Sequence, residues 1–215
     1  MSGIMLRAVR RTRLRRVLIV AALAALGAGP AIAAKFYVDG KLGNLKPSEI
    51  VTVSDPKPVQ LLFEFQSSGV PNAKATKYAK PIAIASINQR HVFSELSEEA
   101  APGRAVLTIS MNNIPEKGAA GKGFKTGLTF GLAPLKVTDS YVAHFELLRG
   151  PGSAPIACDV EHALHMTMGK GEDPSIGVLV KNATDGIQMV IDQTMAHGIN
   201  CLAGKMAAPP AAAGQ

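Results

Sequence analysis

The residues best suited to chemistry are two cysteines and three histidines in the last third of the chain. They are Cys158, His162, His165, His197 and Cys201. Thiolate and imidazole groups are ligands of zinc, and a site needs several of them to converge on one ion. A metal site is therefore the first hypothesis to test against the spacing of these residues.

The spacing argues against that site. From Ile156 to Met168, apolar residues recur at every second position, with His162 among them, which predicts a half-buried strand. Residues three apart on a strand point to opposite faces, so His162 and His165 cannot both reach one ion without a bulge. We therefore expect no metal and no cofactor. A metal or small-ligand site that uses His162, His165 and His197 is the alternative.

The two cysteines are better explained as a structural pair. Cys158 lies on the apolar face of the predicted strand, and Cys201 lies on an apolar stripe at helical spacing near the end of the chain. Both sulfur atoms should point between helix and sheet, so we predict a Cys158–Cys201 disulfide. The bridge closes a loop of about 42 residues, which the chain-entropy model values at about 4 kcal/mol at most. Buried sulfurs without a Cys-x-x-Cys motif are not expected to act in redox chemistry.

A glycine-rich segment, residues 119–135, has glycines at four-residue spacing with apolar side chains between them. Small residues at this spacing let a helix approach another surface closely, and exposed apolar segments commonly mark contact sites. The predicted interaction residues are Gly123, Phe124, Gly127, Leu128, Phe130, Gly131 and Leu132. A hairpin in which Thr126, Thr129 and Phe130 extend two strands explains the same pattern.

The sequence lacks the nucleophile motifs of common hydrolases. It has neither a Gly-x-Ser-x-Gly elbow nor a phosphate-binding glycine loop. Asp139, Ser140 and His144 are close in sequence, but on a strand Ser140 and His144 are about 13 Å apart, too far for direct proton transfer. We expect no enzymatic activity.

The elements that position these residues are several strands and two helices. Asn72 can cap a helix that Pro81 kinks or shortens, and a closing helix is predicted to begin at Pro174 or Ser175. The predicted strands are Ile50–Val53 within an extended stretch 36–53, residues 59–66, Val92–Phe93, 106–112, 141–148 and 156–168. This order predicts an α+β fold in which helices cover one face of a mostly antiparallel sheet.

The start of the chain resembles a targeting segment. Residues 1–33 combine an arginine-rich beginning, the apolar run Val17–Leu26 and small residues around Ala33, as a cleavable signal peptide does. Of the 23 Lys and Arg residues in the chain, six are arginines of this segment; the remaining 17 face 16 acidic residues. The near-neutral remainder gives no reason to expect a nucleic-acid partner.

The predicted mature chain is one domain. Residues 34–206 are enough to bury a substantial core, and the Ala/Pro-rich residues 207–215 are expected to be disordered. A disulfide fits an oxidising compartment, so we expect a periplasmic location after cleavage near Ala33.

The order of elements also resembles a known class of small domains. An apolar strand, a helix ending near the sequence HVFSEL, a glycine-rich hairpin before VTDSYVAHFELL and a C-terminal helix cover about residues 58–205. This order is similar to that of small α+β periplasmic domains in outer-membrane assembly factors and in envelope lipoproteins of the curli-secretion type. The chain departs from the lipoproteins in lacking a lipid-bearing cysteine, and no functional residue is carried over from them.

These observations lead to one functional hypothesis. We expect a non-enzymatic envelope protein that binds another envelope protein, a membrane surface or a second copy of itself. The contact would use a sheet edge or the 119–135 segment.

Overall fold

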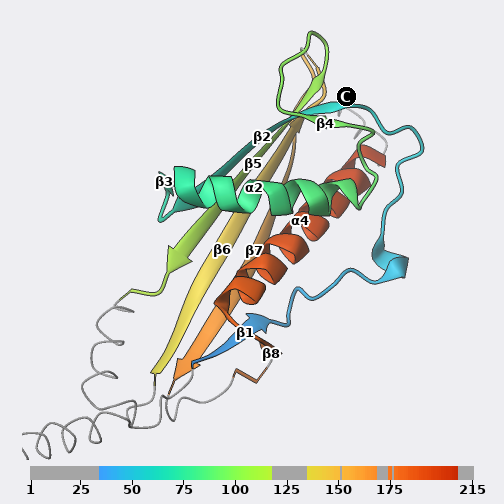
Figure 1. Ribbon diagram of the computed structural model, residues 1–215. Coiled ribbons are helices and arrows are strands. Elements are labelled where there is room, and N and C mark those ends of the chain that lie inside the picture. Colours follow the sequence, from blue (N-terminus) through green and yellow to red (C-terminus); the bar gives the residue numbers. More distant parts are fainter. Residues whose placement is uncertain (1–33, 118–134, 151, 169–173, 176, 208–215) are drawn as a thin grey trace, which may run out of the picture.

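The computed structural model describes residues 34–117, 135–150, 152–168, 174–175 and 177–207 (Figure 1). Its strands are β1 (Lys35–Asp39), β2 (Val59–Ser67), β3 (Val70–Pro71), β4 (Leu96–Ser97), β5 (Ala105–Pro115), β6 (Leu135–Leu148), β7 (Ile156–Met168) and β8 (Gly177–Val180). Its helices are the short 3-10 helix η1 (Pro47–Glu49), α2 (Ala73–Asn88) and α4 (Ala183–Ala207). The predicted signal peptide lies outside the described residues, as does the predicted tail after Ala207.

The described strands form one sheet. Its order is β3-β2-β5-β6-β7-β1-β8, and β4 pairs with β2 beside the start of that strand. Among the strand pairs that the structure describes, only β2–β5 and β2–β4 are parallel. Helix α2 lies between β2 and β5 in sequence and makes the crossover that a parallel pair requires. The predicted α+β class with a mostly antiparallel sheet is confirmed.

Both long helices cover the same face of this sheet (Figure 1). Side chains alternate along each strand, so one face can be apolar while the other remains polar. The covered face is buried, whereas Glu64, Thr108 and Asp159 on the other face are exposed. The largest fully buried side chains are Phe145, Leu61, Ile87, Leu107, Ile109, Met111, Leu147, Ile191, Met195, Ile199, Leu202 and Val38. The predicted one-sided helical layer is therefore confirmed.

Helix α2 begins at the predicted cap. The side-chain oxygen of Asn72 accepts a hydrogen bond from the backbone N–H of Ala75, at 3.0 Å, which satisfies one of the unpaired donors of the first turn. The helix continues through Pro81 to Asn88, so Pro81 does not mark its start. Among the described residues, neither long helix is both long enough and apolar enough to cross a membrane.

Three predicted elements are wrong. The first strand is Lys35–Asp39 rather than Ile50–Val53, and the N–H of Val51 donates to the side-chain oxygen of Asn200 instead. Val92–Phe93 forms no strand; Val92 is a buried loop residue, and β4 follows at Leu96–Ser97.

The third error concerns the start of the closing helix. Gly177–Val180 is strand β8, paired antiparallel with β1, and α4 begins only at Ala183. The short run Gly-Val-Leu-Val between Pro174 and Asn182 carries a strand signal. The strong helical stripe that follows it obscures that signal in the sequence.

Candidate functional site

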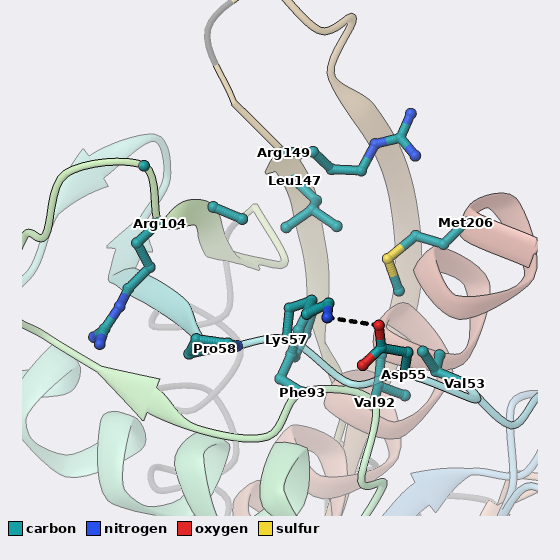
Figure 2. A pocket seen from close by; sticks show the side chains of 12 residues that line it. Val53, Asp55, Lys57, Pro58, Val92, Phe93, Arg104, Leu147, Arg149 and Met206 are labelled. Atoms are coloured by element: carbon teal, nitrogen blue, oxygen red, sulfur yellow. Dashed lines mark ion pairs between the residues drawn. The ribbon is translucent and has the colours of Figure 1, made fainter.

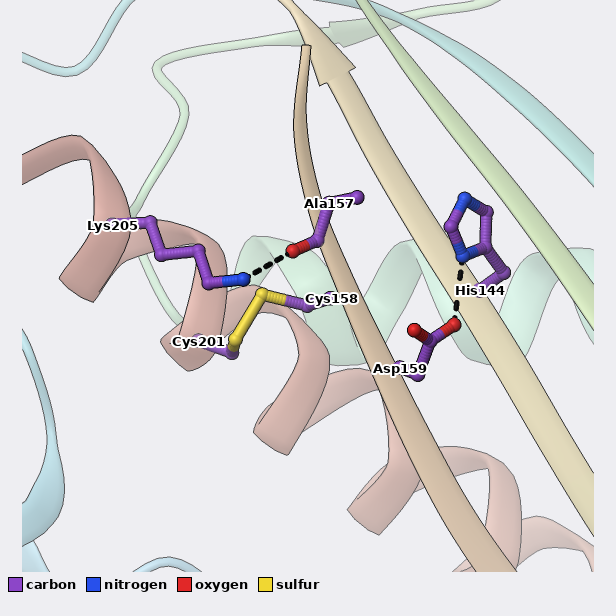
Figure 3. Close-up of a disulfide and its surroundings, with 6 residues drawn as sticks. All are labelled: His144, Ala157, Cys158, Asp159, Cys201 and Lys205. Atoms are coloured by element: carbon purple, nitrogen blue, oxygen red, sulfur yellow. Dashed lines mark hydrogen bonds and ion pairs between the residues drawn. A yellow bond between two sulfur atoms is a disulfide. The ribbon is translucent and has the colours of Figure 1, made fainter. Parts of the chain in front are cut away.

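The disulfide joins the two elements predicted to carry it. Cys158 on β7 and Cys201 on α4 are bonded, and their Cα atoms are 6.3 Å apart (Figure 3). Next to it, the Lys205 ammonium donates a hydrogen bond to the backbone oxygen of Ala157. Cys158 is buried, so the bridge ties α4 to the sheet from inside the core. The pair is structural and stabilises the contact between helix and sheet.

The three histidines of the alternative site do not come together. His162 faces α4, where its Nε2 lies 2.7 Å from the Gln193 side-chain oxygen. His165 lies on the other face, with its Nδ1 2.9 Å from the Thr138 hydroxyl. His197 hydrogen-bonds to the backbone oxygen of Gly43. Within the described ranges, no group of three or more His, Cys, Asp or Glu side chains could hold a metal ion.

His162 has a structural task instead. The Gln193 side-chain oxygen accepts a hydrogen bond from the His162 ring, and the Gln193 side-chain N–H donates to the Asn44 side-chain oxygen, at 3.0 Å. This chain of hydrogen bonds, which is buried at His162 and Gln193, ties the loop after β1 to α4. Burial lowers the pKa of His162, and the hydrogen bond to Gln193 opposes that shift. A neutral ring fits this environment.

A second polar group lies near the β1 end of the sheet. It is on the open face, that is, the face that neither long helix covers. Thr138 and His165 are directly opposite each other on β6 and β7, and the His165 Nε2 is 3.8 Å from a carboxylate oxygen of Asp39. The Thr138 hydroxyl, the His165 imidazole and the Asp39 carboxylate thus lie next to one another in space. The distance between imidazole and carboxylate exceeds a hydrogen bond, so this geometry does not by itself make a nucleophile.

The other residues considered for catalysis are also separated. His144 lies opposite Asp159 and approaches its carboxylate at 2.7 Å on the open face (Figure 3). Ser140 lies opposite Ala163 instead. The His144–Asp159 pair is exposed on both sides, where such pairs contribute little.

The predicted interaction residues Gly123, Phe124, Gly127, Leu128, Phe130, Gly131 and Leu132 lie outside the described residues. The described residues on either side of them lie near one end of the sheet. Pro115 on β5 pairs with Asp139 on β6, and Leu135 at the start of β6 pairs with Met168 at the end of β7. Leu135 is 3% exposed and belongs to the fold.

The same end of the sheet carries a feature that the sequence analysis missed, the β8 edge, defined as Gly177–Val180. Val178 is 50% exposed and Leu179 is 62% exposed. Neighbouring residues of a strand face opposite sides, so this strand shows apolar side chains on both. β8 pairs with β1 and, within the described part of the chain, with no strand on its outer side.

Gly177 allows the β8 edge to lie close to β1. A Cβ atom at this position would be 2.8 Å from the Cβ of Tyr37, which is closer than two carbon atoms tolerate. Tyr37 is itself buried and lies between His165 on β7 and Leu179 on β8. The edge strand therefore rests on a firmly packed neighbour, although its own side chains are exposed.

The opposite edge of the sheet is different. There, β2 is flanked by β3 at one end and by β4 at the other, and Lys80 of α2 forms an ion pair with Glu98 beside it at 2.7 Å. Short flanking strands, a proline at Pro71 and charged side chains are the usual ways to block an edge. β8 has neither a proline nor a charged residue.

No protein-family model and no curated protein sequence matches the chain. The chain is similar in structure to the PelC dodecamer from Paraburkholderia phytofirmans (12% identity, 79% of this chain, 97% of PelC, TM-score 0.35). It is also similar to rare lipoprotein B from Shewanella oneidensis (12% identity, 69% of this chain, 93% of that chain, TM-score 0.32).

Proposed function

We propose that this chain is a non-enzymatic, exported protein of the cell envelope that binds a partner through the β8 edge. The exposure of Val178 and Leu179, on a strand that has no outer neighbour among the described strands, carries the proposal. An edge strand of this kind offers unpaired backbone groups to an extended segment of a partner, and its side chains add apolar contacts.

Two further points support a location in the cell envelope. The Cys158–Cys201 disulfide is a bond that persists in oxidising compartments such as the periplasm. The predicted signal peptide of residues 1–33 would deliver the chain there. Among the described residues, His162 is buried and hydrogen-bonded to Gln193, and the His144–Asp159 pair is exposed.

The edge can be tested by placing charges on it. The double variant Val178→Lys and Leu179→Lys should abolish association, because lysines on an edge strand oppose further strand pairing. Leu62→Lys is the matched control, since Leu62 is 46% exposed on the open face of β2. Photo-crosslinking from position 179 in cells should give a discrete adduct, and the same probe at position 62 should not give it.

Sedimentation of the purified chain separates two kinds of partner. A second copy on the edge would give a concentration-dependent dimer that the double lysine variant loses. A different envelope protein would leave the purified chain monomeric while the crosslinked adduct persists in cells. Absence of both the dimer and the adduct, with the chain folded, would contradict the proposal.

The 119–135 segment is the second contact surface that we propose. Replacing residues 119–133 by a short turn keeps Leu135, which is buried, so the fold should survive. Association with the partner or with vesicles should weaken if Phe124, Leu128, Phe130 and Leu132 contribute apolar contacts. Unchanged association would remove this segment from the proposal and leave the β8 edge as the contact.

A further inference from the structure

The end of the sheet away from β8 contains a cavity of about 330 Å³. Five separate parts of the chain build it: the segment before β2, the loop after α2, the start of β5, the end of β6 and the last turn of α4 (Figure 2). Its volume is at the lower end of the range for small-molecule sites, which extends from about 300 to 1,000 Å³.

The floor of the cavity is apolar. Leu147 and Val92 line it and are 1% and 3% exposed. Phe93 and Met206 are partly buried against the core and complete the apolar wall. A ligand with an apolar body would therefore replace water over side chains that cannot hydrogen-bond to it.

The rim of the cavity is cationic. Figure 2 shows Arg104 and Arg149 on different sides of Leu147, with Lys57 and Asp55 paired nearby. Arg104 makes a loose ion pair with Glu95, at 3.7 Å. Arg149 is exposed and has no ion pair or side-chain hydrogen bond to another described residue. Two guanidinium groups thus retain donors that suit a carboxylate or phosphate.

One feature opposes an anion here. Helix α4 ends beside the cavity, and its last carbonyls carry a partial negative charge of about half an elementary charge. The three cations Lys57, Arg104 and Arg149 face the Asp55 carboxylate in the lining and the Glu95 carboxylate beside Arg104. One positive charge remains in excess, and it outweighs this partial charge. The electrostatic balance at the rim therefore favours a ligand with one negative head group.

We propose that this cavity binds a small amphiphilic anion, with its apolar body on Leu147 and Val92 and its head group at Arg149, while Arg104 adds positive charge on the other side of Leu147. A single short acyl chain with a carboxylate is the ligand chemistry that the cavity fits. The limited volume argues against a two-chain membrane lipid. This proposal does not depend on the β8 edge, which lies at the other end of the sheet.

The test uses the full mature chain and three eight-carbon probes: octanoate, 1-octanol and octylammonium. Calorimetry should show that octanoate binds more tightly than octanol, and that octylammonium does not bind. The double variant Arg104→Glu and Arg149→Glu should weaken octanoate binding by about tenfold or more, because it removes charge-assisted hydrogen bonds. Lys136→Glu is the matched control, since Lys136 is an exposed cation at the other end of β6.

A second variant tests the apolar part. Met206→Trp lies in the last turn of α4 and should fill the cavity without unfolding the chain, so octanoate and octanol should both bind less tightly. Equal binding of octanoate and octylammonium would overturn the proposal, as would unchanged octanoate binding in the double glutamate variant.

Discussion

Two regions of the molecule contain similar apolar residues. The contact between α4 and the sheet buries them, whereas the β8 edge leaves them exposed. Beneath α4, Phe145 on β6 and Ile191 on the helix are fully buried, and a disulfide closes the contact. At the β8 edge, Val178 and Leu179 remain exposed on a strand that pairs with β1 alone among the described strands. Apolar side chains without a covering element are costly to keep at a surface. This difference is the reason to look for function at the edge.

Removal of the disulfide should have the largest effect on stability. The double variant Cys158→Ser and Cys201→Ser should lose about 2–4 kcal/mol of the free energy of unfolding, because the unfolded chain regains the freedom of a closed loop. Urea unfolding measures this loss, and the wild-type chain under reducing conditions should show the same loss. Partner binding by the β8 edge of the folded variant should not change. Equal stability with and without the bridge would contradict its structural role.

The acid stability of the chain should depend on His162. Burial lowers the pKa of this histidine below that of the unfolded chain, so the unfolded state binds the extra proton first as the pH falls. Stability is therefore complete above the ordinary histidine pKa and decreases as the pH falls below it. One such group contributes a slope of at most about 1.4 kcal/mol per pH unit.

The variant His162→Gln should reduce this slope between about pH 7 and pH 5. It keeps a polar side chain opposite Gln193, whereas His165→Gln provides the comparison near the β8 edge, where burial also lowers the pKa of the histidine. Chemical unfolding at several pH values measures both slopes. An unchanged slope in His162→Gln would show that other groups control acid stability.

The sequence predicted the long elements well because their patterns are repeated many times. The period-two pattern of 156–168 places Cys158 and His162 on one face of β7, and the helical stripe places Cys201 toward them. The opposite faces of His162 and His165 follow from the same pattern. In such elements one misleading residue does not change the result.

Short or assembled features were out of reach for physical reasons. β8 has only four residues, and its identity depends on pairing with β1, which lies far away in the sequence. The cavity around Leu147 is lined by side chains from five segments. The spacing of these residues along the chain does not show that they lie together in the fold. The β8 edge and the cavity could therefore be recognised only in the folded structure, whereas the disulfide could be predicted from the sequence pattern.

Two glycines of α4 show how the covered face gained its close packing. The sequence alone marks Gly186 and Gly198 as weak points in a helix. In the structure, a Cβ atom at Gly186 would come within 2.6 Å of the Leu164 side chain, and one at Gly198 would come within 2.2 Å of the Phe145 ring. The missing side chains provide the space that these two sheet residues occupy.

The smallest of the predicted stability effects follows from this packing. Gly198→Ala should destabilise the fold by about 1 kcal/mol, because overpacking costs about 1–3 kcal/mol and the better helix propensity of alanine returns about 1 kcal/mol. Gly204→Ala is the matched control in the same helix, since its nearest neighbour would be Val51 at 3.9 Å. That variant should be stabilised slightly. Urea unfolding measures both effects. A gain of stability in both variants would show that α4 does not pack tightly on Phe145, and the contrast with the exposed β8 edge would then be lost.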